Sequence, residues 1–361
     1  MVSRRNLIIG GVVVVVAAGV GIAAMNNNNS DSKKNFSVAM VTDVGGVDDK
    51  SFNESAWNGV SEWGKSHDLQ KGKNGYDYFA SKTNADFATN FQQGVSAGYN
   101  MLIGVGYATN DALVASAKQN PKTDYVLIDD VAKKQYKNVA SLTYKQQEAS
   151  YLAGVAAATK AKELGDSKVG FIGGMNSVVI QSFEAGYIAG VKSVDPNMTV
   201  DAQFVESFTD TAKAKTIASA IYTSGAHVIF QAAGPAGNAV FTAAKDINTD
   251  LDFGSKDKAW VIGVDMDQND QGNYKTKDGK SDNFTLTSAI KEIASSIVKV
   301  ANQSMKGEFP GGETVVYGLK DGGVAITKKN LDAEEKAAVE KAEEAIKSGE
   351  VTVPSTMKQN V

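Results

Sequence analysis

The stretch SVAMVTDVGGVDDKSFNESAWNGV (residues 37–60) contains the repeating unit from which the fold follows. An apolar, β-branched run ends at Asp43, a Gly-containing loop comes next, and a helical pattern begins near Ser51. Short strands that alternate with helices are typical of a parallel sheet, because parallel neighbours need a crossover connection. The stretch therefore predicts a β-loop-helix unit and an α/β fold.

The same unit recurs along the chain in two blocks, which predicts two doubly wound parallel-sheet lobes joined by a hinge. Such sheets bind ligands beyond the carboxyl ends of their strands, so we expect the site in a cleft between the lobes. The predicted strands cover 37–44, 76–82, 101–106, 124–130 and 139–144, then 168–174, 199–207, 226–234, 259–265 and 284–288. The predicted helices lie near 51–66, 86–98, 110–119, 145–163, 178–193, 210–224, 237–247 and 288–306.

We expect the two lobes to share the chain in alternating pieces. The N-terminal lobe is predicted to take residues 36–143 plus about 285–312, and the C-terminal lobe residues 144–284 plus about 313–330. The polar stretch 268–283 is predicted to be an exposed loop. Residues 331–361 are predicted to form a charged helix and tail, and a surface helix is favoured over a partner-binding one because apolar residues are sparse there.

The N-terminus has the pattern of a membrane segment. Arg4 and Arg5 precede an uncharged apolar stretch at 7–25, and a polar run at 26–35 follows as a linker. A helix over 7–25 would be about 28 Å long, close to the ~30 Å hydrocarbon core of a bilayer. We therefore predict an N-terminal transmembrane anchor with the rest of the chain on the extracytoplasmic face. A cleaved signal peptide, which would release a secreted protein, is the alternative.

Composition excludes several function classes. The net charge of −4 over 361 residues gives no electrostatic reason to expect a nucleic-acid partner. The chain has no cysteine, which excludes disulfides and thiolate metal sites, and it has only two histidines. The glycine-rich signatures of nucleotide-binding enzymes are absent, so we predict neither an enzyme nor a cofactor or metal site.

Phe52 is the most informative single residue of the first unit. An aromatic side chain at the mouth of a polar loop could stack on a flat heterocycle, which is worth about 1–3 kcal/mol for a nucleobase. Alternatively, Phe52 packs on the first turn of its own helix. Spacing alone leaves both interpretations open.

Four segments carry a joint signal when taken in order: VAMVTDVGGVDDKSFNESAWNGV (38–60), SLTYKQQEASYLAGVAAA (141–158), VGFIGGMNSVVIQSFEAGYIAGVKSVDPN (169–197) and VIGVDMDQ (261–268). Together they resemble the basic membrane protein family of substrate-binding lipoproteins, which includes purine nucleoside receptors. The resemblance implies a type I periplasmic-binding-protein fold and a protein that works as a monomer with an ABC permease and its ATPase subunits. It also implies a purine nucleoside as the small-molecule ligand.

The resemblance assigns site residues position by position. Phe52 and Phe208 would clamp the base from opposite lobes, and Asp43 is the carboxylate before the loop. The implied ribose contacts are Gly234, Asp265 and Lys291.

Three further residues, Asn53, Asp111 and Asp129, match the implied site more loosely. Asp111 could instead cap the following helix, and Asp129 could belong to a solvated turn. The chain departs from the family pattern because it has no lipobox cysteine to acylate. Other functions left open are a receptor for a sugar or another small polar ligand, a surface interaction protein and a hydrolase.

Overall fold

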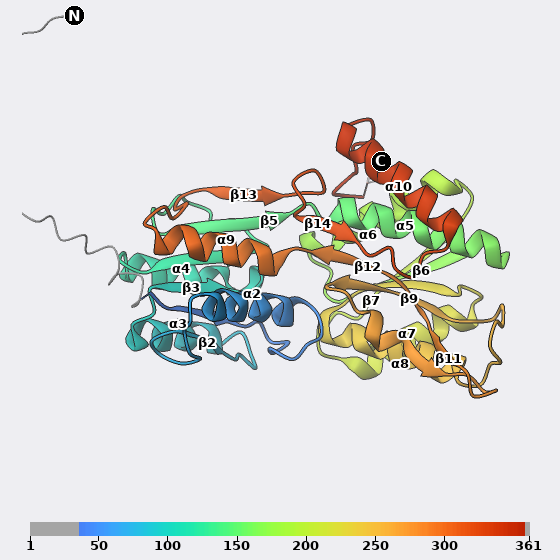
Figure 1. Ribbon diagram of the computed structural model, residues 1–361, viewed down its shortest axis with the longest axis horizontal. Helices are drawn as coiled ribbons and strands as arrows, with labels where there is room; N and C mark the ends of the chain where they lie inside the picture. The colour runs from blue at the N-terminus through green and yellow to red at the C-terminus, as the bar shows by residue number, and fades with distance from the viewer. Residues whose placement is uncertain (1–35, 358–361) are drawn as a thin grey trace, which may run out of the picture. The chain divides into compact units, whose positions relative to one another are not determined.

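Two six-stranded sheets organise residues 36–357, the part of the chain that the computed structural model describes (Figure 1). In the first sheet the strand order is β13-β5-β4-β3-β1-β2, and in the second it is β14-β12-β9-β8-β6-β7. The first sheet consists of β1 (Val38–Val41), β2 (Tyr76–Phe79), β3 (Met101–Gly104), β4 (Asp124–Ile128), β5 (Val139–Tyr144) and β13 (Thr314–Tyr317). The second consists of β6 (Lys168–Gly173), β7 (Thr199–Phe204), β8 (Val228–Ala232), β9 (Trp260–Asp265), β12 (Thr285–Lys291) and β14 (Val324–Ile326).

Both sheets follow the same plan. Numbered within each lobe, the strands run 2-1-3-4-5-6 across the sheet, and only the pair β12–β14 is antiparallel. Each described segment that the sequence predicts as a strand overlaps one of these strands. The predicted α/β class with two doubly wound lobes is therefore confirmed.

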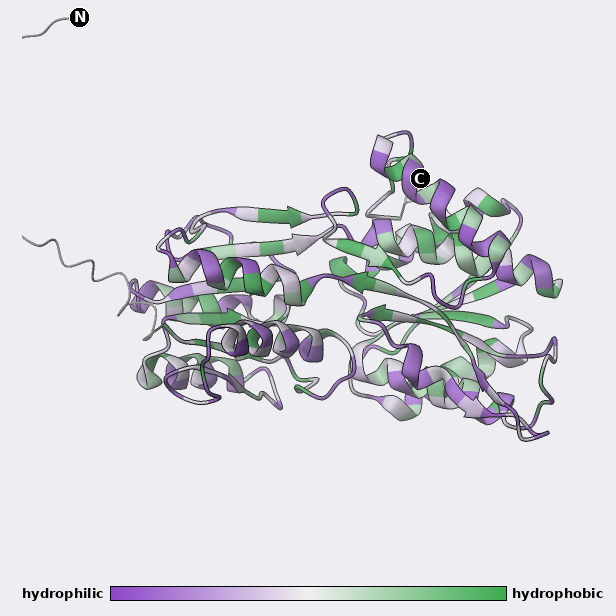
Figure 2. Cartoon of the chain, in the orientation of Figure 1, coloured by the Kyte–Doolittle hydropathy of each residue, from purple (hydrophilic) through white to green (hydrophobic). Residues whose placement is uncertain are grey.

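Helices cover both faces of each sheet. In the first lobe α2 (Phe52–Ser66) packs with α9 (Ile293–Met305), and α3 (Asp86–Ala97) packs with α4 (Asn110–Gln119). In the second lobe α5 (Gln146–Leu164) packs with α6 (Val178–Val194), and α7 (Thr211–Thr223) packs with α8 (Asn238–Asn248). Figure 2 shows hydrophobic residues along the strands of both sheets. In β1, Val38 and Met40 join one core cluster while Ala39 and Val41 join another, as expected for a strand buried on both faces.

The chain crosses between the sheets three times. It leaves the first sheet after Tyr144, returns to α9 after Lys291, and leaves again after Tyr317. Strand β12, which the sequence analysis places with the N-terminal lobe, pairs with β9 in the second sheet, whereas β13 pairs with β5 in the first. The lobe limits as a whole stay a prediction.

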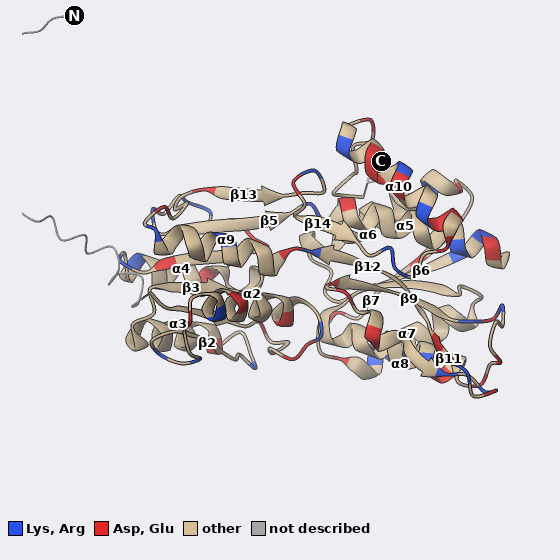
Figure 3. Ribbon diagram, in the orientation of Figure 1, with Lys and Arg blue, Asp and Glu red and all other residues tan. Residues whose placement is uncertain are grey.

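Two segments outside the sheets also have regular structure. The predicted loop 268–283 contains the 3₁₀ turn η3 (Asn269–Gly272) and the hairpin β10–β11 (Asn273–Lys275 and Ser281–Asn283). The C-terminal helix α10 (Ala333–Ser348) begins with a capping box between Asp332 and Glu335 and packs against α5. Figure 3 shows both acidic and basic residues along α10.

The prediction of an N-terminal transmembrane anchor is corrected. Among residues 36–357, no helix is both long enough and apolar enough to cross a membrane. The longest of them, α5, packs inside the second lobe and carries Glu148, Lys160 and Lys162. The segment 7–25 lies outside the described residues.

Helices α5 and α6 approach so closely that they require glycine at their contact. A Cβ on Gly154 would lie 2.2 Å from the carbonyl oxygen of Tyr187, and one on Gly190 would lie 2.0 Å from that of Tyr151. These distances are far below van der Waals contact. The absence of side chains at these positions therefore fixes the spacing of the helix pair.

We predict that Gly154→Ala destabilises the protein although alanine is the better helix former. The gain in helix propensity is about 1 kcal/mol, but separating two packed backbones should lower the free energy of unfolding by about 1–3 kcal/mol more than that. Urea unfolding followed by circular dichroism measures the difference. Lys162→Ala, at an exposed position of the same helix, is the control and should stay within about 0.5 kcal/mol. An unchanged or raised stability for Gly154→Ala would contradict this packing.

Candidate ligand-binding cleft

A cavity of about 410 Å³ lies between the carboxyl ends of the two sheets. In each sheet the strand order reverses beside the first strand, and loops that follow β1, β3, β6 and β8 reach the cavity from these positions. Open α/β sheets bind ligands at such topological switch points. Most of the predicted site residues line the cavity: Asp43, Phe52, Asp129, Phe208, Gly234, Asp265 and Lys291.

The two phenylalanines come from opposite lobes. Phe52 is the first residue of α2, and Phe208 lies in the loop between β7 and α7. Both are partly buried against the main core cluster and also line the cavity, so Phe52 packs on its own lobe and faces the cleft at once. A glycine makes room for the Phe208 ring, since a Cβ on Gly174 would lie only 2.3 Å from it, whereas a Cβ on Gly106 would lie 3.4 Å from the Phe52 ring, which is ordinary contact.

Asp43 is held by a small hydrogen-bond network. Its Oδ1 accepts from the backbone N–H of Gly45 at 2.7 Å and from Asn53 Nδ2 at 2.7 Å. Asn53 Oδ1 in turn accepts from the backbone N–H of Asp43 at 3.0 Å. Burial raises the pKa of the Asp43 carboxyl to about 6, against the lowering effect of these hydrogen bonds. Asn53 does not line the cavity but orients the carboxylate that does.

Asp49, which the sequence analysis did not single out, organises the start of α2. Its buried carboxylate accepts from the backbone N–H groups of Ser51 at 2.9 Å, Asn53 at 2.9 Å and Glu54 at 3.0 Å. It also accepts from Asn53 Nδ2 at 2.8 Å. Asp49 therefore satisfies the free N–H groups of the first turn, a role that usually belongs to the N-cap residue.

Lys291 is a buried cation at the centre of the cleft. It ends β12, its side chain is 1% exposed, and it forms an ion pair with Asp129 of the first lobe. Its Nζ lies 5.0 Å from the centroid of the Phe52 ring and 5.1 Å from that of Tyr144. The second carboxylate oxygen of Asp129, Oδ1, is buried and has no hydrogen-bond partner among the described residues. An unpaired buried acceptor is costly, so this oxygen is suited to a donor on a ligand.

Asp265 ends β9 and faces the same space from the second lobe. Its Oδ2 accepts from the hydroxyl of Ser51 at 2.6 Å. Burial raises the pKa of the Asp265 carboxyl to about 6, although the charge of Lys291 and the hydrogen bond from Ser51 lower it. The charged forms of Asp43 and Asp265 are thus disfavoured by burial, and hydrogen bonds and charges from the protein offset only part of this cost.

Backbone strain is concentrated at this site. Asp129, Glu206 and Asp265 all line the cavity and have left-handed φ values of 65°, 58° and 66°. Residues other than glycine rarely adopt this conformation. It persists only where surrounding contacts hold it in place, and such positions cluster at functional sites. The left-handed conformation turns the backbone at the end of β9, where Asp265 lies, and in the loops after β4 and β7, where Asp129 and Glu206 lie.

Asp111 is the predicted site residue that the structure does not bring to the cleft. It is exposed in the first turn of α4, and it neither lines the cavity nor bonds to the cleft residues. The 3₁₀ turn η1 (Tyr107–Thr109) runs directly into α4 at Asn110, which leaves Asp111 on the outer surface. Asn110 is the residue that makes the local contact, donating to Asp130 at 2.6 Å.

Several cleft residues escaped the sequence analysis. Asn84 comes from a loop of the first lobe, and Glu206, Met175 and Val179 come from the second. Glu206 lies just after β7, so the rule that polar loops at carboxyl ends form the site could have identified it. The apolar residues near the start of α6 carry no such signal.

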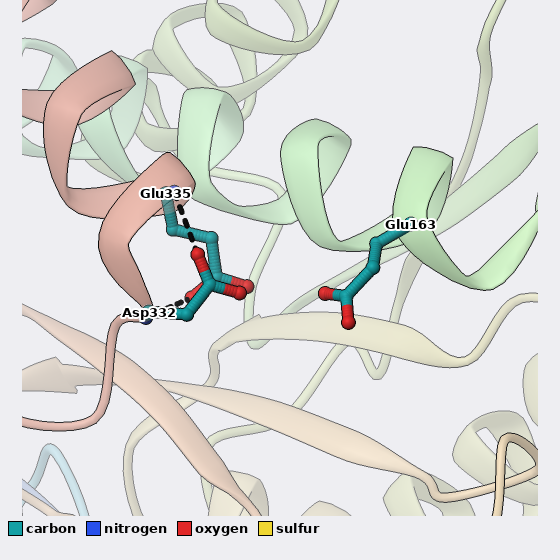
Figure 4. Close-up of side chains that lie close together, drawn as sticks. All are labelled: Glu163, Asp332 and Glu335. Atoms are coloured by element: carbon teal, nitrogen blue, oxygen red, sulfur yellow. Dashed lines mark hydrogen bonds between the residues drawn. The ribbon is translucent and has the colours of Figure 1, made fainter.

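A second cluster of carboxylates lies away from the cleft, where Glu163, Asp332 and Glu335 approach one another (Figure 4). The ammonium of Lys160 lies 2.5, 3.3 and 2.9 Å from their oxygens. Burial disfavours the charged form of Lys160, but its contacts with Glu163 and Glu335 outweigh that effect and raise its pKa. Lys160 thus supplies the positive charge here, and the cluster ties α10 to α5.

Comparison with known proteins gives the family. Residues 36–357 match the Bmp family, described as ABC transporter substrate-binding protein PnrA-like. The chain is 49% identical over 323 residues to the ABC transporter nucleoside-binding protein BmpA of Lactococcus lactis subsp. cremoris, covering 90% of each chain. It is 42% identical over 328 residues to the CD4+ T-cell-stimulating antigen of Listeria monocytogenes, covering 90% of this chain and 89% of that one.

Solved structures agree on the fold. An ABC transporter solute-binding protein from Aeropyrum pernix K1 superposes with a TM-score of 0.77 at 22% identity, covering 90% of this chain and 95% of that one. A glucose-galactose binding protein from Geobacillus stearothermophilus superposes with a TM-score of 0.54 at 14% identity, covering 82% and 99%. The match over residues 36–357 and the 49% identity to BmpA show that the chain belongs to the Bmp family of PnrA-like ABC transporter substrate-binding proteins.

Proposed function

We propose that this substrate-binding protein captures purine nucleosides in the interlobe cleft, with the base between Phe52 and Phe208 and the ribose on buried carboxylates. The observation that carries the proposal is the composition of the cavity wall. One phenylalanine from each lobe lines it, together with Asp129, Asp265 and Lys291. An aromatic clamp beside hydrogen-bond acceptors matches a ligand that has a flat ring at one end and hydroxyls at the other.

The base would be held mainly by stacking. Stacking of a nucleobase on an aromatic side chain contributes about 1–3 kcal/mol per ring and tolerates different bases. Asp43 borders the same part of the cavity, since its Oδ2 and the Phe52 ring both approach Gly106. Its carboxylate could accept an N–H from the edge of a purine, which would add orientation to the stacking.

The ribose would be held by charge-assisted hydrogen bonds. Asp129 Oδ1 is buried without a partner, and Asp265 uses its Oδ2 for Ser51. Hydroxyl donors on a sugar could satisfy the remaining acceptor positions, and each such bond is worth about 1.5–3 kcal/mol. Lys291 is the matching donor and keeps the cleft from accumulating uncompensated negative charge.

Closure of the two lobes is the proposed mechanism of capture. The three connections between the sheets follow Tyr144, Lys291 and Tyr317, and the rings of Tyr144 and Tyr317 stack with centroids 5.5 Å apart. A ligand that touches both lobes favours the closed state by its additional contacts there. The closed monomer would then dock on an ABC permease, and we infer that it acts as a receptor without turning over its ligand.

We predict that Phe52→Ala and Phe208→Ala each raise the Kd for inosine by about 10- to 100-fold, because each removes one stacking surface. Isothermal titration calorimetry with inosine, adenosine and guanosine measures the effect. Phe253→Ala is the matched control, since Phe253 is 51% exposed and lies outside the cavity. Equal Kd values for the three variants would contradict the clamp. Binding of a sugar such as ribose or glucose, with no heat from any nucleoside, would support the sugar-receptor alternative.

We also predict that nucleoside binding weakens in mild acid. Asp43 and Asp265 accept hydrogen bonds from the ligand as carboxylates, and their pKa of about 6 means that both protonate between pH 7 and pH 5. The Kd for inosine should therefore rise about tenfold per carboxyl over this range.

Loss of folding would not explain that weakening. The two pKa values are raised above the ordinary 3.8, so protonation of these carboxyls favours the folded state as the pH falls through 6. Calorimetry at pH 7, 6 and 5, with circular dichroism at each pH, separates the two effects. A constant Kd over this range would contradict a role for these carboxylates in binding.

A further inference from the structure

The loop 45–51 of the first lobe is joined to the second lobe by three hydrogen bonds between protein atoms. Ser51 Oγ donates to Asp265 Oδ2 at 2.6 Å, and Gln268 Nε2 donates to the carbonyl oxygen of Lys50 at 2.7 Å. Asn238 Nδ2 donates to the carbonyl oxygen of Asp49 at 3.0 Å. The second-lobe partners lie at the end of β9, in the loop after it and at the start of α8. Three separate elements thus meet one short loop.

The first-lobe side of this contact is fixed in place. Asp49 accepts the N–H of Ser51 and the N–H of Asn53, which ties the loop to the first turn of α2. Lys50 has a left-handed φ of 60°, so the backbone makes a turn at this residue just before α2 begins. The loop therefore presents its donor and acceptors as part of the rigid N-terminus of α2.

The second-lobe side is equally constrained. The carboxamide oxygen of Gln268 accepts from Gln231 Nε2 at 2.8 Å and from the N–H of Val264 at 2.9 Å. Both glutamines are buried, with exposed fractions of 2% and 0%. Because these bonds fix the oxygen end, the Nε2 end points to Lys50. Separation of the lobes would break this hydrogen bond, and water would have to take the place of the Lys50 carbonyl.

We propose that Ser51 is a positioning residue that couples closure of the lobes to ligand recognition, and that loop 45–51 is the latch through which it acts. Ser51 and Asp265 belong to different lobes, so their bond exists only when the lobes are together. The bond engages Oδ2 of Asp265 and orients the carboxylate, with Oδ1 available to the ligand. The acceptor for the ribose is therefore completed by the other lobe. The part of this inference that concerns ribose rests on the proposed function.

Reciprocity follows from this arrangement. If closure improves the Asp265 acceptor, a ligand bound to Asp265 must stabilise closure by the same free energy. Asn238 and Gln268 stabilise closure through their bonds to loop 45–51, and neither of these two side chains lines the cavity. Removing either kind of contact should shift the protein toward the open state, but only removal of Ser51 should also disorder the acceptor.

Two variants and one control test the latch. Ser51→Ala removes the bond to Asp265, and Asn238→Ala removes a latch bond outside the cavity. Ser61→Ala is the matched control, because Ser61 is a buried serine of α2, the helix that follows Ser51, and its hydroxyl has no partner among the described residues. Stopped-flow and calorimetric binding of inosine, and X-ray scattering of the ligand-free proteins, are compared for the wild type and the three variants.

We expect Ser51→Ala to raise the Kd about tenfold or more, mainly through faster dissociation, and Asn238→Ala to raise it about threefold. Both should increase the radius of gyration of the ligand-free protein, whereas Ser61→Ala should match the wild type. Equal Kd values for Ser51→Ala and Ser61→Ala would overturn the role of Ser51. A higher Kd with an unchanged radius of gyration in both latch variants would overturn the latch.

The X-ray scattering measurement uses ligand-free protein, so it tests the latch whatever the ligand is. If the wild type binds no nucleoside, the proposed function fails, while the radius of gyration still tests the latch. If Ser51→Ala fails to fold, as thermal denaturation would show, Asn238→Ala alone decides: an unchanged radius of gyration overturns the proposal.

Discussion

Burial of carboxylates between two lobes is the constraint on which the rest of this structure depends. Asp43, Asp129 and Asp265 line one cleft, and burial raises the pKa of the Asp43 and Asp265 carboxyls to about 6. Their close partners are Lys291, Ser51, Asn53 and the backbone N–H of Gly45. Compensation is incomplete, as the unpartnered Oδ1 of Asp129 shows. A cleft of this kind favours a polar ligand that brings hydrogen-bond donors to the free acceptor positions.

The fold explains why these charges meet. Two sheets with the same strand order direct their carboxyl ends to one space, and the chain crosses between them immediately after Lys291. The residue that neutralises Asp129 is therefore also placed at a connection between the lobes. The same geometry brings the loop at the start of α2 against the end of β9 and the start of α8, so a carboxylate that lines the cleft, Asp265, also makes an interlobe contact.

Local sequence patterns were sufficient for the strands and helices of the repeating β-loop-helix unit and for the fold class, because that unit is recognisable from its own residues. They missed β10, β11, β13 and β14, which lie outside the unit. The family resemblance assigned Asp43, Phe52, Asp129 and Asp265, which line the cavity. Patterns failed where the answer depends on distant parts of the chain. The pairing of β12 and β13 with opposite sheets is set by three-dimensional neighbours, and so is the role of Asp49. Asp111 looked equivalent to the other carboxylates in sequence, yet a 3₁₀ turn leaves it outside the cleft.

The central claim is that one ligand joins the two phenylalanines to the buried carboxylates. A crystal structure of the protein grown with inosine tests it most directly. The account predicts electron density for the purine between Phe52 and Phe208, with ribose hydroxyls within hydrogen-bond distance of Asp129, Asp265 and Lys291. Density for the nucleoside outside the cleft, or in it with the ribose turned away from these three residues, would contradict the account.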